Sequence, residues 1–256
     1  MKYLFPKAAA LVLAGAGLLT QAAHAQYSTG DLLLDLQSTT SGQDYIVDLS
    51  QSASAYAAST SAIVYQLSLS ALNSALGSSW QTSANWFVIG SAPGGSPTLY
   101  ASETESVLGT QNTQGLQRKS GSTHNSAQSK IDTIGGATAG QGTTAVVADG
   151  SASGWAPNAS VLGGVLQRNT FTSGGLSSAV SDLSVDAFYN TASPKAFGAV
   201  KGWFTFGIDS LDSSLVDFTY NVPTVAAPEP MTYGLFAGAG LLALCLGQQF
   251  RRKVQA

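Results

Sequence analysis

Apolar residues in this chain occur mostly in short runs, separated by turns rich in Gly, Ser and Thr. The runs DLLLDLQ at 31–37 and DYIVDL at 44–49 have the length of strands, and a polar turn joins them. This pattern predicts a β-hairpin. The next run, AIVYQL at 62–67, is rich in β-branched and aromatic residues and predicts a third strand.

Helical spacing follows the third strand. Leu69, Leu72 and Leu76 fall on one face of a helix, so we expect a short helix over 69–76. The same spacing is weaker at 124–134, where it predicts a marginal helix.

Further strand patterns occur in the rest of the chain. WFVIG at 86–90 predicts a buried strand that pairs with TLYA at 98–101. VDAFY at 185–189 predicts another strand. The runs at 200–208 and 215–222 predict a hairpin in which one face is buried and the other is in water.

Short strands, frequent turns and few helices predict a mainly β protein, an antiparallel β-sandwich with one or two short helices. The stretch 109–145 is poor in large apolar residues and rich in Gly, Ser, Thr and Gln. If the β-rich part divides into two domains, we expect the division in this stretch, as a flexible insert.

The first 25 residues have the pattern of a secretory signal peptide. Lys2 and Lys7 lie before an apolar stretch of 12 residues at 8–19, and Ala23 and Ala25 are small residues ahead of Gln26. We expect a signal helix that engages the Sec translocon and is cut by signal peptidase before Gln26. An N-terminal membrane helix is the alternative, but a span needs roughly 20 apolar residues.

The C-terminal end carries a second apolar stretch. Residues 231–247 hold 17 residues without a charge, which predicts a transmembrane helix over about 231–249. Arg251, Arg252 and Lys253 follow it. Because basic clusters stay in the cytoplasm, the residues before this helix are expected outside.

A proline-rich triplet, Pro228, Glu229 and Pro230, comes directly before that helix. Each proline biases the residue before it away from helical conformation. The triplet is therefore expected to be extended and open to a protease. A plain proline linker ahead of an ordinary membrane anchor is the alternative.

This tail resembles the PEP-CTERM sorting signal: a Pro-Glu-Pro triplet, an apolar helix and an Arg-rich end, here over 228–256. The resemblance implies cleavage near the triplet by an exosortase, a membrane cysteine protease-transferase of Gram-negative bacteria. The protein would be anchored transiently in the inner membrane and then pass to the cell surface or outside the cell. More loosely, the strand patterns are similar to those of exported PEP-CTERM proteins of unknown activity, which supply no catalytic residues.

The expected exported part, residues 26–227, is acidic and lacks cysteine. It holds 13 acidic and 6 basic residues, so its net charge is −7. Such a surface repels phosphate backbones and argues against nucleic acid as a partner. The one cysteine of the chain, Cys245, lies in the tail, so the exported part forms no internal disulfide and depends on its core.

Catalytic and metal-binding patterns are weak, and we expect no catalytic residues, no cofactor and no metal. His124 is the one histidine of the exported part, in a region without large apolar neighbours to position it. Asp209, Asp212 and Asp217 gather around one turn, where calcium would find oxygen ligands. Solvated turn aspartates are the simpler interpretation.

Trp80 and Trp155 are the only candidates for ligand contacts. Both lie in Ser- and Gly-rich stretches, where an exposed indole could stack on a sugar ring. Trp86 and Trp203 lie within apolar strands and are expected in the core.

The sequence thus favours a non-enzymatic, secreted protein with a structural role at the cell surface or in the extracellular biofilm matrix. The alternative is a carbohydrate-binding surface protein that uses exposed aromatics, with exopolysaccharide as its partner. An enzyme has the least support.

Overall fold

The structure is a computed structural model that describes residues 27–94, 97–104, 114–139, 141–171, 175–186 and 197–223. The predicted signal helix and transmembrane helix both lie outside these residues. No helix within the described ranges is both long enough and apolar enough to cross a bilayer.

The described residues form ten strands, five α-helices and two short 3₁₀ turns. The strands are β1 Asp31–Ser38, β2 Gln43–Ser52, β3 Ile63–Ser68, β4 Ala84–Ala92, β5 Thr98–Thr104, β6 Thr144–Ala148, β7 Asn169–Thr170, β8 Val180–Asp186, β9 Ala199–Ile208 and β10 Leu215–Asn221. The helices are α1 Ala53–Ala58, α2 Leu69–Leu76, α3 Trp80–Ser83, α4 Gly121–Gly135 and α5 Trp155–Leu162. The 3₁₀ turns are η1 Gly136–Thr138 and η2 Leu176–Ser178.

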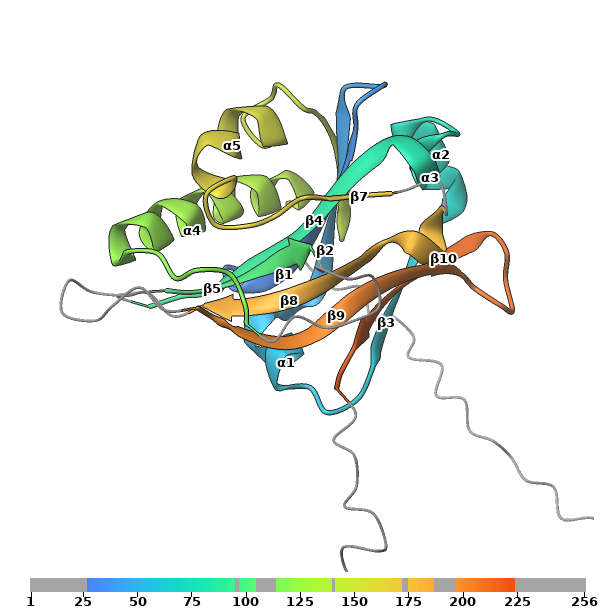
Figure 1. The fold of residues 1–256 in the computed structure, drawn as a ribbon. Helices are drawn as coiled ribbons and strands as arrows, with labels where there is room; N and C mark the ends of the chain where they lie inside the picture. Colours follow the sequence, from blue (N-terminus) through green and yellow to red (C-terminus); the bar gives the residue numbers. More distant parts are fainter. Residues whose placement is uncertain are drawn as a thin grey trace, which may run out of the picture.

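All strands belong to one antiparallel sheet, in the order β3-β10-β9-β8-β5-β4-β1-β2-β6, with β7 beside β4 (Figure 1). The edges are β3 and β6. Edge strand β3 pairs with the last strand, β10, with Tyr65 opposite Phe218. The order in space therefore differs from the order along the chain.

The central strand β1 is buried on both faces. Leu32, Leu34 and Leu36 point to one face and Leu33 to the other, and none of these side chains is exposed. Sheet faces that are both covered require a nearly continuous apolar sequence, which is the pattern LLLDL. The predicted hairpin with β2 is confirmed, with Leu36 opposite Tyr45.

One face of the sheet curls around an aromatic core. The ring centroids of Phe204 and Phe218 are 5.0 Å apart, and those of Phe206 and Phe218 are 4.8 Å apart. Trp86 packs edge-on against Phe206 at 5.0 Å. Tyr56 of α1 reaches the same cluster, 6.4 Å from Phe204. These rings come from β4, β9, β10 and α1, so they join both halves of the sheet.

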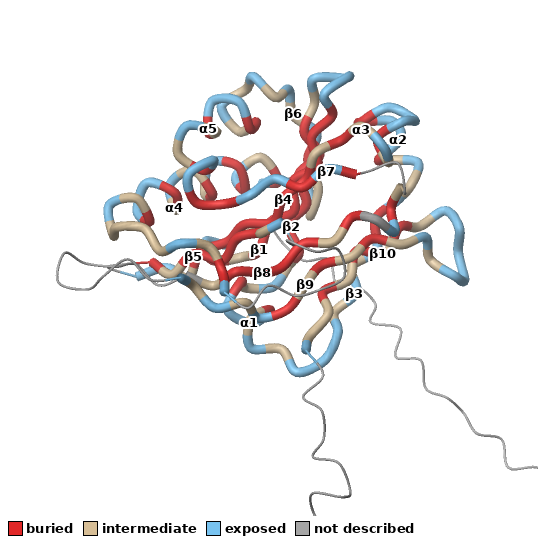
Figure 2. Tube along the Cα trace, viewed as in Figure 1, coloured by how far each residue is buried: buried red, intermediate tan, exposed pale blue. Residues whose placement is uncertain are grey.

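Helices α4 and α5 cover the other face, as Figure 1 shows. Ile131 and Ile134 of α4 are fully buried in a second cluster that includes Phe87 of β4. Figure 2 shows buried residues following the central strands and exposed residues on the turns and outer helix surfaces. The fold therefore has a helix layer, a sheet and an enclosed core on the far side of that sheet.

A hydrogen bond links the two edges of the curled sheet. The Tyr65 hydroxyl of β3 donates to Thr143 Oγ1 at 2.9 Å, directly before β6. The carbonyl of Thr143 in turn accepts from the amide of Asp48 in β2 at 2.7 Å. The curl thus brings the outermost strands within side-chain reach.

The mainly β, antiparallel class is confirmed, as is the helix at 69–76. The predicted two-sheet sandwich differs from the structure, because β8 and β5 connect both halves into one sheet that forms both walls of the core. Five α-helices replace the expected one or two. The helix expected at 124–134 is confirmed as α4, and its residues Ala127, Ile131 and Ile134 belong to the core, so this part of the stretch 109–145 is not a flexible insert.

Replacing Phe218 by Ala should lower the free energy of unfolding by about 3–5 kcal/mol, because it leaves a cavity among three other rings. Urea denaturation followed by tryptophan fluorescence measures this loss. The matched control is Thr219→Ala on the opposite face of β10, with an expected change of about 1 kcal/mol or less. Equal losses in the two variants would contradict the enclosed core.

Candidate functional site

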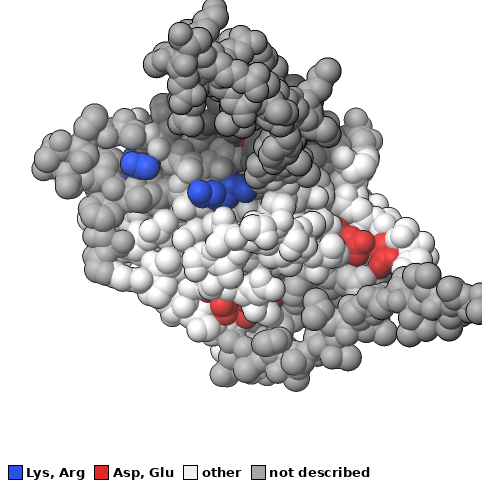
Figure 3. All heavy atoms as spheres, turned by 90° about the horizontal axis from the view of Figure 1, so that it is seen from below, with Lys and Arg blue, Asp and Glu red and all other residues white. Residues whose placement is uncertain are grey.

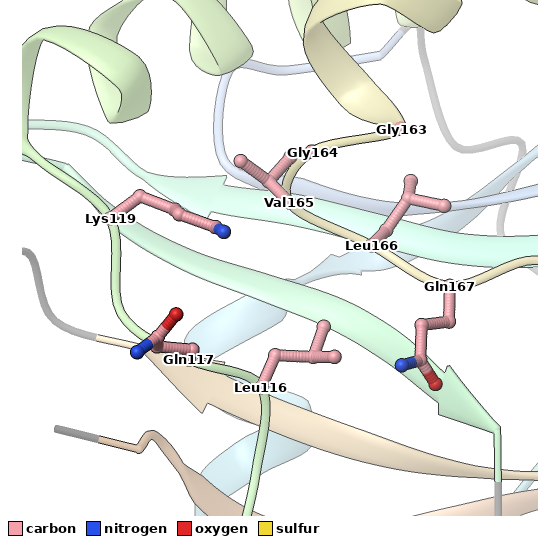
Figure 4. A pocket seen from close by; sticks show the side chains of 8 residues that line it. All are labelled: Leu116, Gln117, Lys119, Gly163, Gly164, Val165, Leu166 and Gln167. Atoms are coloured by element: carbon pink, nitrogen blue, oxygen red, sulfur yellow. The ribbon is translucent and has the colours of Figure 1, made fainter. Parts of the chain in front are cut away.

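A shallow cavity of about 250 Å³ lies between the segment that precedes α4 and the segment that follows α5 (Figure 4). Pockets that enclose a drug-sized ligand measure roughly 300–1,000 Å³, so this groove has room for one ring or a short chain. Its lining residues are Leu116, Gln117, Lys119, Gly163, Gly164, Val165, Leu166 and Gln167.

The wall after α5 is fixed to β5 through Gln167. The Gln167 amide donates to the carbonyl of Ser102 at 3.0 Å, and the Ser102 hydroxyl donates to the carbonyl of Gln167 at 2.8 Å. The amide of Thr104 donates to Gln167 Oε1 at 2.9 Å. Helix α5 ends just before Gly163, so the chain between helix and anchor is short.

The opposite wall is fixed to β8 and to the start of β9. Gly115 and Leu116 exchange backbone hydrogen bonds with Gly198, at 3.1 and 2.8 Å. The amide of Leu116 donates to Ser184 Oγ at 2.7 Å. A Cβ on Gly115 would collide with Ser184 Oγ, so this close approach requires glycine. Both walls are therefore held by hydrogen bonds to the sheet.

Lys119 and Gln117 supply the polar groups of the groove. Neither side chain has a hydrogen-bond or ion-pair partner within the part of the chain that the structure describes. Val165 and Leu166 supply apolar surface and are themselves only 7% and 5% exposed. An ammonium and an amide beside apolar surface can hold an anion, but they form no nucleophile–base pair.

Three carboxyl groups lie beneath α5 on the helix-covered face. Asp35 is fully buried, and neither of its carboxyl oxygens has a hydrogen-bond partner among the residues that the structure describes. Asp44 Oδ2 accepts from the amide of Trp155 at 2.7 Å, and Asp149 Oδ1 accepts from the amide of Ala156 at 3.0 Å. Asp44 and Asp149 thus hold the first turn of α5.

Burial favours the protonated, uncharged forms of Asp35 and Asp44. Burial, and then repulsion by Asp44 and Asp149, raises the pKa of Asp35 well above its ordinary value. Burial raises the pKa of Asp44 to about 7 against the opposing hydrogen bond from Trp155, and Asp149 adds to the rise. The uncharged form allows Asp35 and Asp44 to lie in the interior without a cationic partner.

Glu103 of β5 lies on the same face, opposite Asp182 of β8. Burial, with a smaller contribution from Asp182, raises the pKa of Glu103 to about 7. The Glu103 side chain is half-buried and its Oε2 atom is enclosed.

Trp80, predicted to be exposed, is fully buried. Its Nε1 donates to Asn73 Oδ1 at 3.0 Å, and its ring packs edge-on against Phe171 at 5.3 Å. The prediction is wrong because Trp80 begins the short helix α3, which turns the ring into the core.

Trp155, the second predicted ligand contact, is 8% exposed. Its ring lies 4.9 Å from that of Phe87, and the Arg168 guanidinium covers it at 5.1 Å from the ring centroid. Trp155 begins α5 where a loop was expected. Its exposure is therefore also corrected, and neither indole is free to stack on a sugar.

His124 is buried in α4, and its Nδ1 atom lies 2.7 Å from the carbonyl oxygen of Pro97. Its ring is therefore positioned by the fold, whereas the sequence pattern predicted no neighbours that would position it. Across the described ranges, no three His, Cys, Asp or Glu side chains gather closely enough to hold a metal ion. The predicted cleavage residues, sorting triplet and basic cluster lie outside the described residues: Ala23, Ala25, Gln26, Pro228, Glu229, Pro230, Arg251, Arg252 and Lys253.

Sequence reasoning missed the groove and the buried acids. The groove has no local signal, because its walls come from segments far apart in the chain. Asp35 did have a local signal. It interrupts the run LLLDL, in which the residues that point to either face of the strand are apolar. An acid in such a strand is buried on whichever face it lies.

Comparison with protein-family models, curated proteins and solved structures gave no match to this chain. The resemblance of the tail to a sorting signal therefore gains no support from these comparisons and stays a prediction.

Stability should fall as pH rises above about 4. A carboxyl with a raised pKa in the folded state contributes full stability below its unfolded pKa, about 3.9, and loses it as pH rises through the folded pKa. For Asp44 this window runs from about pH 4 to pH 7. Asp35→Asn removes one such group, so the loss of unfolding free energy between pH 4 and 8 should be smaller in this variant than in the wild type.

Chemical denaturation at pH 4, 6 and 8 measures this difference. Asp212→Asn is the control, because Asp212 is exposed and hydrogen bonds from Ser214 lower its pKa. This variant should keep the wild-type decline. An unchanged decline in Asp35→Asn would show that Asp35 is not held in its uncharged form.

Proposed function

We propose that this chain is an exported protein with a non-enzymatic, structural role at the cell surface or in the extracellular matrix. An exosortase would sort it through Pro228, Glu229 and Pro230. The observation that carries the proposal is the order of features along the chain: a signal-peptide pattern at 1–25, a β-rich domain, and the tripartite tail at 228–256.

The contacts of Tyr27 are compatible with this order. Tyr27 is the second residue after the proposed cleavage site, and its hydroxyl donates to Asp132 Oδ1 at 2.7 Å. Its ring also packs against Gly135 of α4. A residue next to the proposed cleavage site thus packs into the domain and would remain with it after processing.

The basis of stability also supports export. The domain has no cysteine, and two apolar clusters on opposite faces of the sheet hold it together. Such a fold is equally stable in oxidising and reducing compartments. Figure 3 shows one face on which charged side chains are few, acidic and basic groups lie apart, and most described surface is uncharged. A surface of this kind suits packing within a matrix better than binding a nucleic acid.

In this proposal the signal helix at 8–19 is removed during export, and the helix at about 231–249 anchors the protein until the exosortase acts. Arg251, Arg252 and Lys253 stay in the cytoplasm. The carbohydrate-binding alternative loses Trp80 and Trp155, the indoles on which it was based, because both are buried.

Protein isolated from the cell surface should begin at Gln26 and lack the residues after the triplet, because both end segments are removed. Intact-mass spectrometry with cell fractionation measures both ends. Surface protein that still ends at Ala256 would contradict sorting by cleavage. The C-terminal segment would then be an ordinary membrane anchor.

The double variant Pro228→Ala, Pro230→Ala should stay at full length in the membrane, because the extended segment is lost. Immunoblots of membrane and surface fractions report the shift. Pro223→Ala, a proline just outside the triplet, is the matched control and should be processed like wild type. Normal processing of the double variant would exclude the triplet as the recognised element.

A further inference from the structure

We infer that the groove between residues 116–119 and 163–167 binds a small carboxylate with an apolar body, such as a short-chain or aromatic acid. This inference stands on the groove alone and is independent of the export route proposed above.

The charge in the groove selects an anion. Figure 4 shows the Lys119 side chain extending from one wall toward the other. No acid within the described residues pairs with its ammonium, and the Gln117 amide on the same wall is likewise without a partner. An ammonium and an amide together offer several donors to one carboxylate.

The rest of the lining selects an apolar body of limited size. Leu116 lies on one wall of the groove and Val165 and Leu166 on the other, as Figure 4 shows. The volume of about 250 Å³ admits one ring or a chain of a few carbons beside the charged group. A single Lys favours a monoanion, whereas polyanions such as phosphates are usually held by several cations or by Arg.

The groove is prepared for this ligand in two ways. Hydrogen bonds between Gln167 and β5, and from the Leu116 amide to Ser184 Oγ, fix both walls, so little order has to be created on binding. Glu103, next to the Thr104 that anchors Gln167, has a raised pKa, which reduces the negative charge that would oppose an anion.

Calorimetric titration of the purified protein with hexanoate tests the inference, with acetate and hexanamide as comparison ligands. Hexanoate should bind saturably. Acetate lacks the apolar body and hexanamide lacks the charge, so each should bind at least about tenfold more weakly. No binding of hexanoate, or equal binding of hexanamide, would overturn the inference. Equal binding of acetate would show a simple anion site and would also overturn it.

Lys119→Gln should weaken hexanoate binding about tenfold or more, because the carboxylate loses its charged partner. The matched control is Lys201→Gln, an exposed lysine of β9 outside the groove, which should bind hexanoate like wild type. Thermal unfolding of both variants checks that the fold is unchanged. Equal weakening in the two variants would mean that general charge attracts the ligand, and the groove would be excluded as its site.

Discussion

Burial of both faces of the central strands is the constraint on which the rest of the structure depends. β1 and β4 carry large apolar side chains at successive positions, so neither face can be left in water. The protein covers one face with α4 and α5. It covers the other by curling its own sheet, which brings β9, β10 and β3 over β1 and β4 and makes a second sheet unnecessary. The aromatic rings of β9 and β10 fill the space inside the curl.

The same constraint decides where polar side chains on these strands lie. Asp35, Gln37 and Asp44 are on the helix-covered face, so they become interior groups. Gln37 accepts from Arg168 at 3.1 Å, and Asp44 accepts from the first turn of α5. These contacts, with the Gln167 anchor on β5, fix the whole segment from α5 to β7. One wall of the groove is part of that segment, and its position therefore depends on polar contacts made deep in the helix-covered layer.

The sequence predicted the elements whose periodicity is complete within a short stretch. α2 was expected at 69–76, and β9–β10 shows the expected alternation of buried and part-buried residues. It missed α1 and α3, because helices of six and four residues depend on tertiary packing for their stability. It also missed α5, which begins after Gly154 and has no side-chain cap. The single curled sheet and the groove were also missed, because both arise from pairings between distant segments. Trp80 and Trp155 were misplaced for the same reason, since the packing of short helices decides their exposure.

The pairing of β3 with β10 has a consequence for how the chain acquires its shape. About 150 residues separate these partners, as Tyr65 and Phe218 show. Contacts between such remote segments are slow to form, since a long loop must close before any interaction rewards it. One border of the sheet lacks its neighbour until the final hairpin has been synthesised. The curled sheet is therefore completed only when nearly all of the described residues, from β1 to β10, are available.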